Sequence, residues 1–120
     1  MEKLDNNFTI NGKSGRKYEF CMYSISSFDE VKGAFKDISA IYIFTRRYKQ
    51  KDGKFVHTLI YCGETEHLNL RFYNHDHEND INAHNANCIC VMRVGNADRE
   101  NFEADILEGN DFPCNTQHNC

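Results

Sequence analysis

Two tyrosines, an arginine, a histidine and a carboxylate are the side chains whose types and spacing could do chemistry: Tyr42, Tyr61, Arg71, His75 and Glu103. A phenol has an ordinary pKa of about 10, so it acts as a base only beside a cation or a proton acceptor. A guanidinium offers a planar fork to a phosphate, and a carboxylate can hold a hard divalent ion that otherwise binds water and phosphate. Together these groups could supply the base, the phosphate contact and the metal ligand that phosphodiester hydrolysis needs.

The two tyrosines lie in segments that are typical of β-strands. Residues 40–45 are rich in β-branched and aromatic side chains, and residues 55–62 form a second run of this kind. The turn dipeptide Asp52-Gly53 lies between them. The sequence therefore predicts a hairpin with one tyrosine on each strand.

A helix is expected between Thr65, a candidate N-cap, and about His77, because Leu68 and Phe72 fall four apart on one face. Arg71 and the histidine four residues after it would share the adjoining edge of that face. The helix would then present a cation and an imidazole side by side.

The second half of the chain predicts a loop, a strand and a helix. Residues 74–87 are rich in Asn and His and are expected to form the loop, and residues 88–94 form a third apolar strand. Asp98 is a candidate N-cap for a last helix that closes at Gly109. Glu103 would lie at the edge of the buried stripe of that helix.

The first 37 residues predict a hairpin followed by a short helix. Asn11-Gly12 is a hairpin-type turn signal, and residues 17–23 alternate as a strand does. Ser27 is a candidate cap for a helix over residues 28–36.

This order of elements and motifs resembles the GIY-YIG endonuclease family. The first tripeptide is met by Ala40-Ile41-Tyr42, with Ala for the family's Gly, and the second by Tyr61-Cys62-Gly63, with Cys for Ile. The family's Arg followed four residues later by His is met by Arg71 and His75. Its Glu preceded four residues earlier by Arg is met by Glu103 and Arg99, and its Asn after a Pro by Asn115. The resemblance covers about residues 38–116.

The resemblance implies an α/β (α+β) domain over residues 38–120, with a small three-stranded antiparallel central sheet flanked by helices. Residues 1–37 would be an N-terminal extension packed on that domain. It also implies a DNA endonuclease that depends on Mg²⁺ or Mn²⁺. The implied catalytic residues are Tyr42 and Tyr61, which position or activate water, His75 as a proton acceptor, Arg71 on the phosphate, Glu103 as the metal ligand and Asn115, which shapes the site.

A basic stretch between the two tyrosine strands is a candidate DNA contact: Arg46, Arg47, Lys49, Lys51 and Lys54. The chain as a whole has a net charge of −4, which argues against a general nucleic-acid coat protein. The basic stretch could bind DNA phosphates, or it could be a solvated loop without a binding function.

Each candidate site residue also has a structural interpretation. The tyrosines could be packing residues, the Arg–His pair a helix surface pair, Glu103 a partner of Arg99, and Asn115 a turn residue. A non-catalytic nucleic-acid- or protein-binding module with the same fold is therefore the alternative function, and Ala40 in place of Gly supports it.

The cysteines offer a third interpretation, a zinc-binding interaction protein. Cys114, His118 and Cys120 resemble half of a zinc knuckle, with Cys88 or Cys90 as an uncertain fourth ligand. Buried, reduced thiols are favoured over disulfides, because no CxxC pair and no export signal accompany the cysteines. No apolar run reaches the roughly 20 residues of a membrane span, so we expect a cytoplasmic protein without a membrane partner.

Overall fold

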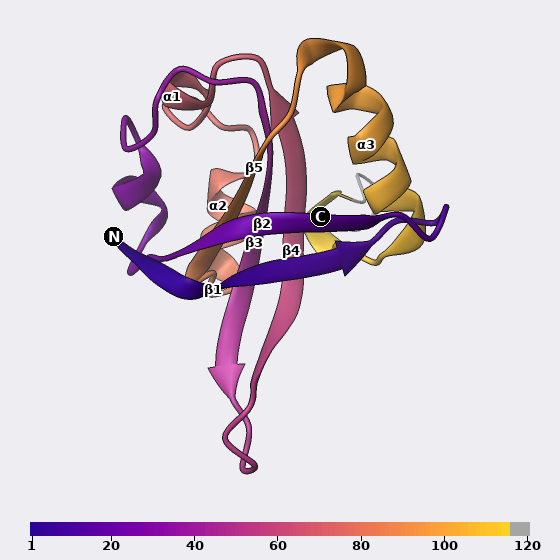
Figure 1. Cartoon of the computed structure of the whole chain (residues 1–120). Coiled ribbons are helices and arrows are strands. Elements are labelled where there is room, and N and C mark those ends of the chain that lie inside the picture. Colours follow the sequence, from indigo (N-terminus) through magenta and orange to yellow (C-terminus); the bar gives the residue numbers. More distant parts are fainter. Residues whose placement is uncertain (116–120) are drawn as a thin grey trace.

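The computed structural model describes residues 1–115 as an α+β domain built on a five-stranded antiparallel sheet (Figure 1). The strands are β1 (Glu2–Asn11), β2 (Lys17–Ser24), β3 (Ala40–Lys49), β4 (Phe55–Thr65) and β5 (Cys88–Arg93). The helices are α1 (Leu68–Arg71), α2 (Glu78–Ala83) and α3 (Asn96–Gly109), with short 3₁₀ turns η1 (Phe28–Val31) and η2 (Pro113–Asn115). Within this described range, no helix is long and apolar enough to cross a membrane.

The sheet has the strand order β1-β2-β5-β3-β4, so it is larger than the three strands that the sequence predicts. Those three strands, β5, β3 and β4, lie side by side as expected. The N-terminal hairpin adds two more, because β2 pairs antiparallel with β5 from Cys21 opposite Val91 to Ser24 opposite Cys88. The boundary after residue 37 stays a prediction, although one hydrogen-bonded sheet contains strands from both sides of it.

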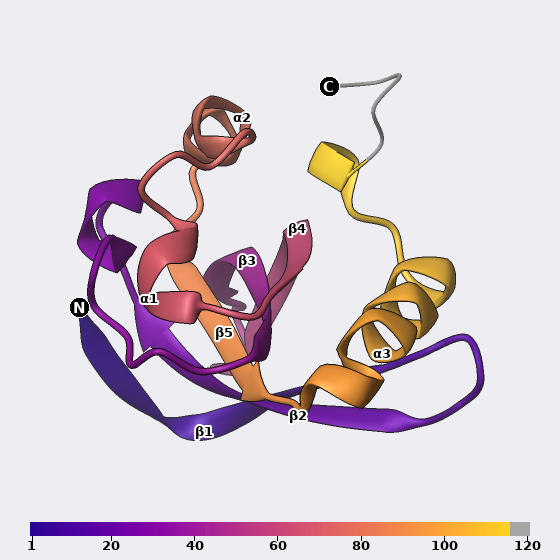
Figure 2. The same cartoon turned by 90° about the horizontal axis from the view of Figure 1, so that it is seen from above.

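Helices cover both faces of the twisted sheet. Figure 2 shows α1 and α2 on one side of β3, β4 and β5, and α3 on the other. The alternation along β3 explains this arrangement, because successive side chains point to opposite faces. Tyr42 and Phe44 join the core under η1, α1 and α2, whereas Ile41 and Ile43 join the core under α3.

The helix expected to reach His77 is wrong in length and position. Thr65 still belongs to β4, and its hydroxyl accepts the backbone N–H of His67, the residue that precedes α1. The first helix is a single turn that ends at Arg71, and α2 forms inside the segment expected to be a loop. At the end of α1 the Tyr73 N–H donates to the carbonyl of Leu70, only three residues back, and further on His75 Nδ1 accepts the backbone N–H of His77 in place of a helical carbonyl.

Two other helix boundaries also differ from expectation. The short N-terminal helix ends at Val31, and the Glu30 carboxylate accepts the backbone N–H groups of Ser26 and Ser27 at its start. The last helix begins two residues before Asp98, after Gly95, and its end at Gly109 is confirmed.

Candidate functional site

A buried hydrogen bond joins the first tyrosine to the histidine. The Tyr42 hydroxyl lies 2.6 Å from His75 Nε2, and the two side chains are 0% and 6% exposed. The other ring nitrogen, Nδ1, accepts the backbone N–H of His77 at 3.1 Å. Burial, with a smaller effect of the Arg71 charge, lowers the pKa of His75 to about 3, so the ring is neutral near pH 7. The single ring proton is therefore on Nε2, which donates to the Tyr42 oxygen.

The second tyrosine continues this chain of hydrogen bonds. Burial raises the pKa of Tyr42 well above 10, and a hydrogen bond to Tyr61 raises it further. The same bond lowers the pKa of Tyr61. Because the Tyr42 oxygen accepts from His75 Nε2, the Tyr42 hydroxyl proton is free to donate to Tyr61. Burial still raises the pKa of Tyr61, but Arg71 opposes that rise. Tyr61 is 8% exposed, so it is the phenol of the pair that meets solvent.

Gly63 makes room for this arrangement. It lies opposite Tyr42 in the β3–β4 register, and a Cβ atom at Gly63 would come within 2.4 Å of the Tyr42 oxygen. Any other residue would push the first tyrosine away from the second. The glycine of the Tyr61-Cys62-Gly63 tripeptide is thus required by the packing of the two rings.

Asn115 holds the strand that carries Tyr61. Its side-chain Oδ1 accepts the backbone N–H of Cys62 at 2.8 Å, and its Nδ2 donates to the Cys62 carbonyl at 2.7 Å. The amide thus pairs with β4 as a neighbouring strand would, at an edge of the sheet with no further strand among the described residues. The residue that the resemblance expects in the site acts on the backbone next to Tyr61.

Arg71 ends α1 beside the two tyrosines. Its positive charge lowers the pKa values of Tyr42 and Tyr61. Among residues 1–115 its guanidinium makes no hydrogen bond or ion pair. The expected four-residue spacing to His75 on one helix is wrong, since the histidine lies in the turn after α1. Both residues nevertheless reach the same site, and the guanidinium is available to an anion.

Glu103 reaches the site from α3. Burial, aided by the nearby carboxylates of Glu64 and Glu100, raises its pKa to about 7. Its negative charge in turn raises the pKa of Tyr61, which places the carboxylate within electrostatic reach of that phenol. No hydrogen bond or ion pair to its carboxylate is found in the described part of the chain.

The alternative interpretation of Glu103 as the partner of Arg99 does not fit this geometry. The Arg99 guanidinium pairs instead with Glu64, and with Glu66 at 3.4 Å, at the end of β4. It also donates to the Ser39 hydroxyl at 3.0 Å. Arg99 is only 6% exposed, so this network fastens the first turns of α3 to β4. Arg99 therefore positions the helix. Its charge slightly opposes the rise in the pKa of Glu103, but no hydrogen bond or ion pair joins the two side chains within residues 1–115.

The N-terminal hairpin fastens the other half of α3. The Asp105 carboxylate accepts the backbone N–H of Ser14 at 2.9 Å and the Tyr18 hydroxyl at 2.7 Å. Gly12 allows this close approach, because a Cβ atom there would overlap the Asp105 carboxylate. The N-terminal extension (residues 1–37) thus helps to fix the position of α3, and with it Glu103, relative to the sheet.

Two residues at the site are not found by the sequence reasoning. The His77 ring lies 4.9 Å from the Tyr61 ring, whereas the sequence favours a solvated side chain. The Phe28 ring, from the extension, lies 5.6 Å from the His75 ring. Phe28 carries no polar atom, and only its place in a capped helical turn signals that it packs inward.

The site offers little protein ligation to a metal ion. Among the described residues, no group of three or more His, Cys, Asp or Glu side chains is placed to hold one. The carboxylate of Glu103, without a partner and raised in pKa, still fits a hard ion such as Mg²⁺ that takes its other ligands from water and phosphate.

The basic residues of the hairpin separate onto two faces. Arg46 donates to the Asn85 carbonyl at 3.1 Å, while the Arg47 guanidinium lies 3.6 Å from the Phe55 ring centroid. Lys51 and Lys54 flank the turn at Gly53, where φ is +86° as a left-handed position requires. Lys49 ends β3. The hairpin itself is confirmed, with its turn at the expected dipeptide.

The candidate fourth zinc ligands lie apart from Cys114. Cys88 and Cys90 are buried free thiols on the α3 face, whereas Cys114 belongs to the opposite core. One neighbour of the Cys114 sulfur is His84 Nδ1, at 3.3 Å. The two remaining candidates, His118 and Cys120, lie outside the described residues.

Comparison of the chain with protein families, curated proteins and solved structures gives no match.

Proposed function

We propose that this chain is a divalent-metal-dependent DNA endonuclease of the GIY-YIG type. The observation that carries the proposal is the hydrogen-bonded series His75, Tyr42 and Tyr61, which ends between two charged groups without partners. Arg71 and Glu103 are those groups, and they come from opposite faces of the sheet. A site that only packed a core would not gather an unpaired cation and an unpaired carboxylate around a phenol.

Tyr61 is the proposed general base. Its oxygen accepts a hydrogen bond from the Tyr42 hydroxyl, and the Arg71 charge also favours its ionised form. The phenolate takes a proton from water as the water oxygen bonds to phosphorus, and the bond to the leaving oxygen breaks. Tyr42 is fully buried, so it positions Tyr61 and touches no substrate. His75 holds the Tyr42 oxygen, and in this arrangement it does not take up a proton.

Arg71 would lie against the phosphate, where its guanidinium offsets the negative charge that develops in the transition state. Glu103 would hold the metal ion, which when bound supplies Lewis-acid stabilisation of the phosphate and of the leaving oxygen. Asn115 acts through the backbone of β4 and is a positioning residue.

The direct test is cleavage of supercoiled plasmid DNA by the purified chain. We expect nicked and linear products with Mg²⁺ or Mn²⁺ and none with EDTA. A triple variant, Tyr61→Phe with Arg71→Ala and Glu103→Ala, purified in the same way, controls for contaminating nucleases. Binding without cleavage in every metal would instead support the non-catalytic module.

Location and partners belong to this proposal as well. DNA is the proposed partner, with no membrane component. The thiols of Cys21, Cys62, Cys88 and Cys90 are free, which suits a reducing compartment, and we propose the cytoplasm.

A further inference from the structure

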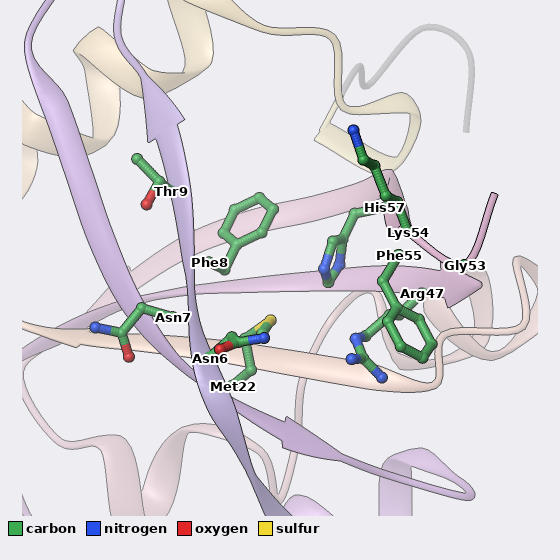
Figure 3. Close-up of a pocket in the computed structure, with 10 residues that line it drawn as sticks. All are labelled: Asn6, Asn7, Phe8, Thr9, Met22, Arg47, Gly53, Lys54, Phe55 and His57. Carbon is green, nitrogen blue, oxygen red and sulfur yellow. The ribbon is translucent and has the colours of Figure 1, made fainter. Parts of the chain in front are cut away.

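A pocket of about 550 Å³ lies between β1 and the outer half of the β3–β4 hairpin (Figure 3). It opens on the sheet face that carries α3, because Phe8 and Met22 in its lining belong to that core. The tyrosine site lies on the opposite face. The pocket is therefore separate from the catalytic residues described above.

Cations and an aromatic ring form one wall of this pocket. The Arg47 guanidinium stacks on the Phe55 ring at 3.6 Å, and Lys54 lies next to them in the turn. Arg47 Nε is buried and makes no hydrogen bond within the described residues. No Asp or Glu is among the described residues that line the pocket. On a chain of net charge −4, this is a locally positive site.

A fixed imidazole forms the floor. His57 Nδ1 shares a hydrogen bond of 2.7 Å with the Thr45 hydroxyl, and its ring meets the Phe8 ring edge-on at 4.8 Å. Burial and the Arg47 charge lower the pKa of His57 to about 4, so the planar ring is neutral near pH 7.

Asn6 and Asn7 lie at the rim; Figure 3 shows the Asn6 amide beside Met22, whereas the Asn7 side chain points to the other side of β1. They lie where the β1–β2 pairing shifts its register, between Lys3 and Asn7. Amide side chains can donate to and accept from the edges of a nucleobase.

We propose that this pocket binds an unpaired strand of DNA, with bases against Phe55 and His57 and phosphates on Arg47 and Lys54. Flat rings beside cations are the combination by which proteins bind single strands, because every unpaired base offers a stacking face. A base pair inside a duplex has no free face to offer. Phe55 is 49% exposed, so its ring can receive a base without unfolding the hairpin.

The position of the pocket connects it to cleavage, and this step rests on the proposed endonuclease function. His57 and Tyr61 are four residues apart on β4, about 13 Å along a strand. β4 is an edge strand in the described sheet, so a bound strand can pass around it from one face to the other. The pocket would thus select DNA with an unpaired segment and direct cutting to its junction with duplex.

Binding is measured in EDTA, where cleavage does not interfere, by fluorescence anisotropy of labelled oligonucleotides. Three probes of equal length are compared: oligothymidine, the same backbone without bases, and a blunt duplex. We expect oligothymidine to bind about tenfold more tightly than the abasic strand, as stacking of one base would give. Phe55→Ser should abolish that difference and leave abasic binding unchanged, whereas Tyr73→Ser, an exposed aromatic outside the pocket, should have no effect.

A pair of adjacent arginines provides the charge control. Arg47→Gln and Arg46→Gln remove the same charge from the same strand, but only Arg47 lines the pocket. We expect the Arg47 change to weaken oligothymidine binding several-fold more than the Arg46 change. Lys54→Gln is a second variant in the pocket lining. Because Lys54 lies in the exposed turn, we expect this change to weaken oligothymidine binding without affecting the fold.

Equal affinities for oligothymidine and the abasic strand, or equal effects of the two arginine changes, would overturn the proposal. Failure of the endonuclease proposal gives a different result: selective binding would remain, but no DNA would be cut when Mg²⁺ is added. A duplex with a single-stranded flap tests the connection between strand binding and cleavage. If the wild type cuts it near the junction and Phe55→Ser cuts it elsewhere, the pocket directs the position of cleavage.

Discussion

The two ends of the β3–β4 hairpin differ in burial and in the chemistry that we propose for each. At the inner end, Tyr42 and Tyr61 are almost fully buried, and burial raises both of their pKa values. At the outer end, Tyr48 and Phe55 are about half exposed beside the cations. The chemistry proposed for the inner end would depend on desolvation and fixed hydrogen bonds. The binding proposed for the outer end would depend on exposed rings and on charge, whose effect salt screens.

The two ends also differ in what supports them. The N-terminal extension braces the inner end, since Phe28 packs on His75 and the Ser14 region holds Asp105 of α3. Figure 1 shows the tip of the hairpin extending beyond the rest of the sheet, with no helix beside it. Changes at the inner end should therefore alter turnover, and changes at the outer end should alter affinity.

Glu103→Ala should have the largest effect, loss of all Mg²⁺-dependent cleavage. It removes the carboxylate that we propose as the ligand of the ion. Plasmid nicking measures the loss, and Glu108→Ala, an exposed carboxylate on the same helix, is the matched control. Cleavage by Glu103→Ala at the wild-type rate would show that the metal is held elsewhere.

Arg71→Ala should lower the rate at saturating DNA by roughly 10²–10³-fold, because its contact strengthens as charge develops on the phosphate. Affinity should fall far less, which single-turnover rates and anisotropy separate. Arg71→Lys should recover only part of the rate, since an ammonium lacks the planar fork. An effect confined to affinity would make Arg71 a docking residue and weaken the contrast between the two ends.

The two tyrosines should differ in a way that tests the direction of the hydrogen bonds. Tyr61→Phe removes the proposed base and should cost roughly 10²–10⁴-fold in rate. Tyr42→Phe removes only its donor and should cost less, while shifting the rate profile to higher pH because the Tyr61 phenolate loses a hydrogen bond. The full pH–rate profile of each variant is the measurement. A larger loss for Tyr42→Phe would reverse the assignment.

The sequence predicts the parts of this site that depend on strand alternation, and it is wrong where a single side chain redirects the backbone. Tyr42 and Tyr61 lie on neighbouring strands as expected, because β-branched and aromatic runs pair around a clear turn. The Arg71–His75 helix is wrong, since His75 Nδ1 replaces a helical carbonyl as the acceptor for His77. The spacing of apolar residues does not predict a hydrogen bond between a side chain and the backbone.

The sheet size is underestimated for a related reason. Local patterns identify β1 and β2, but the pairing of β2 with β5 joins segments more than sixty residues apart. The burial of Glu103 likewise depends on anchors from Arg99 and Asp105 to other elements. Sequence spacing places the carboxylate at the edge of a stripe, but it does not predict the raised pKa.

Glu103→Gln should stabilise the metal-free protein at pH 8 but not at pH 4. The folded pKa of about 7 lies above the ordinary value near 4.5, so the wild type loses stability as the pH rises through that interval. Because the side chain is partly solvated, the difference should be about 1–2 kcal/mol.

Urea unfolding in EDTA at the two pH values measures this difference. Mg²⁺ should then raise the free energy of unfolding of the wild type at pH 8 and leave that of Glu103→Gln unchanged. Equal responses of the two proteins to Mg²⁺ would remove Glu103 from the metal site without any assay of cleavage.

The smallest effect on turnover is expected at the outer end, where Arg46, Arg47 and Lys49 are changed together to Ser. Each phosphate contact in duplex DNA contributes about 0.9 to the slope of log affinity against log salt concentration. The triple variant should therefore bind more weakly at low salt, and its slope should be flatter by up to roughly 3. The rate at saturating DNA should change little, because these side chains lie away from Tyr61 and Arg71. If affinity and slope both stay at wild-type values, the hairpin is only a solvated surface, and the duplex contact has to be sought on the N-terminal strands.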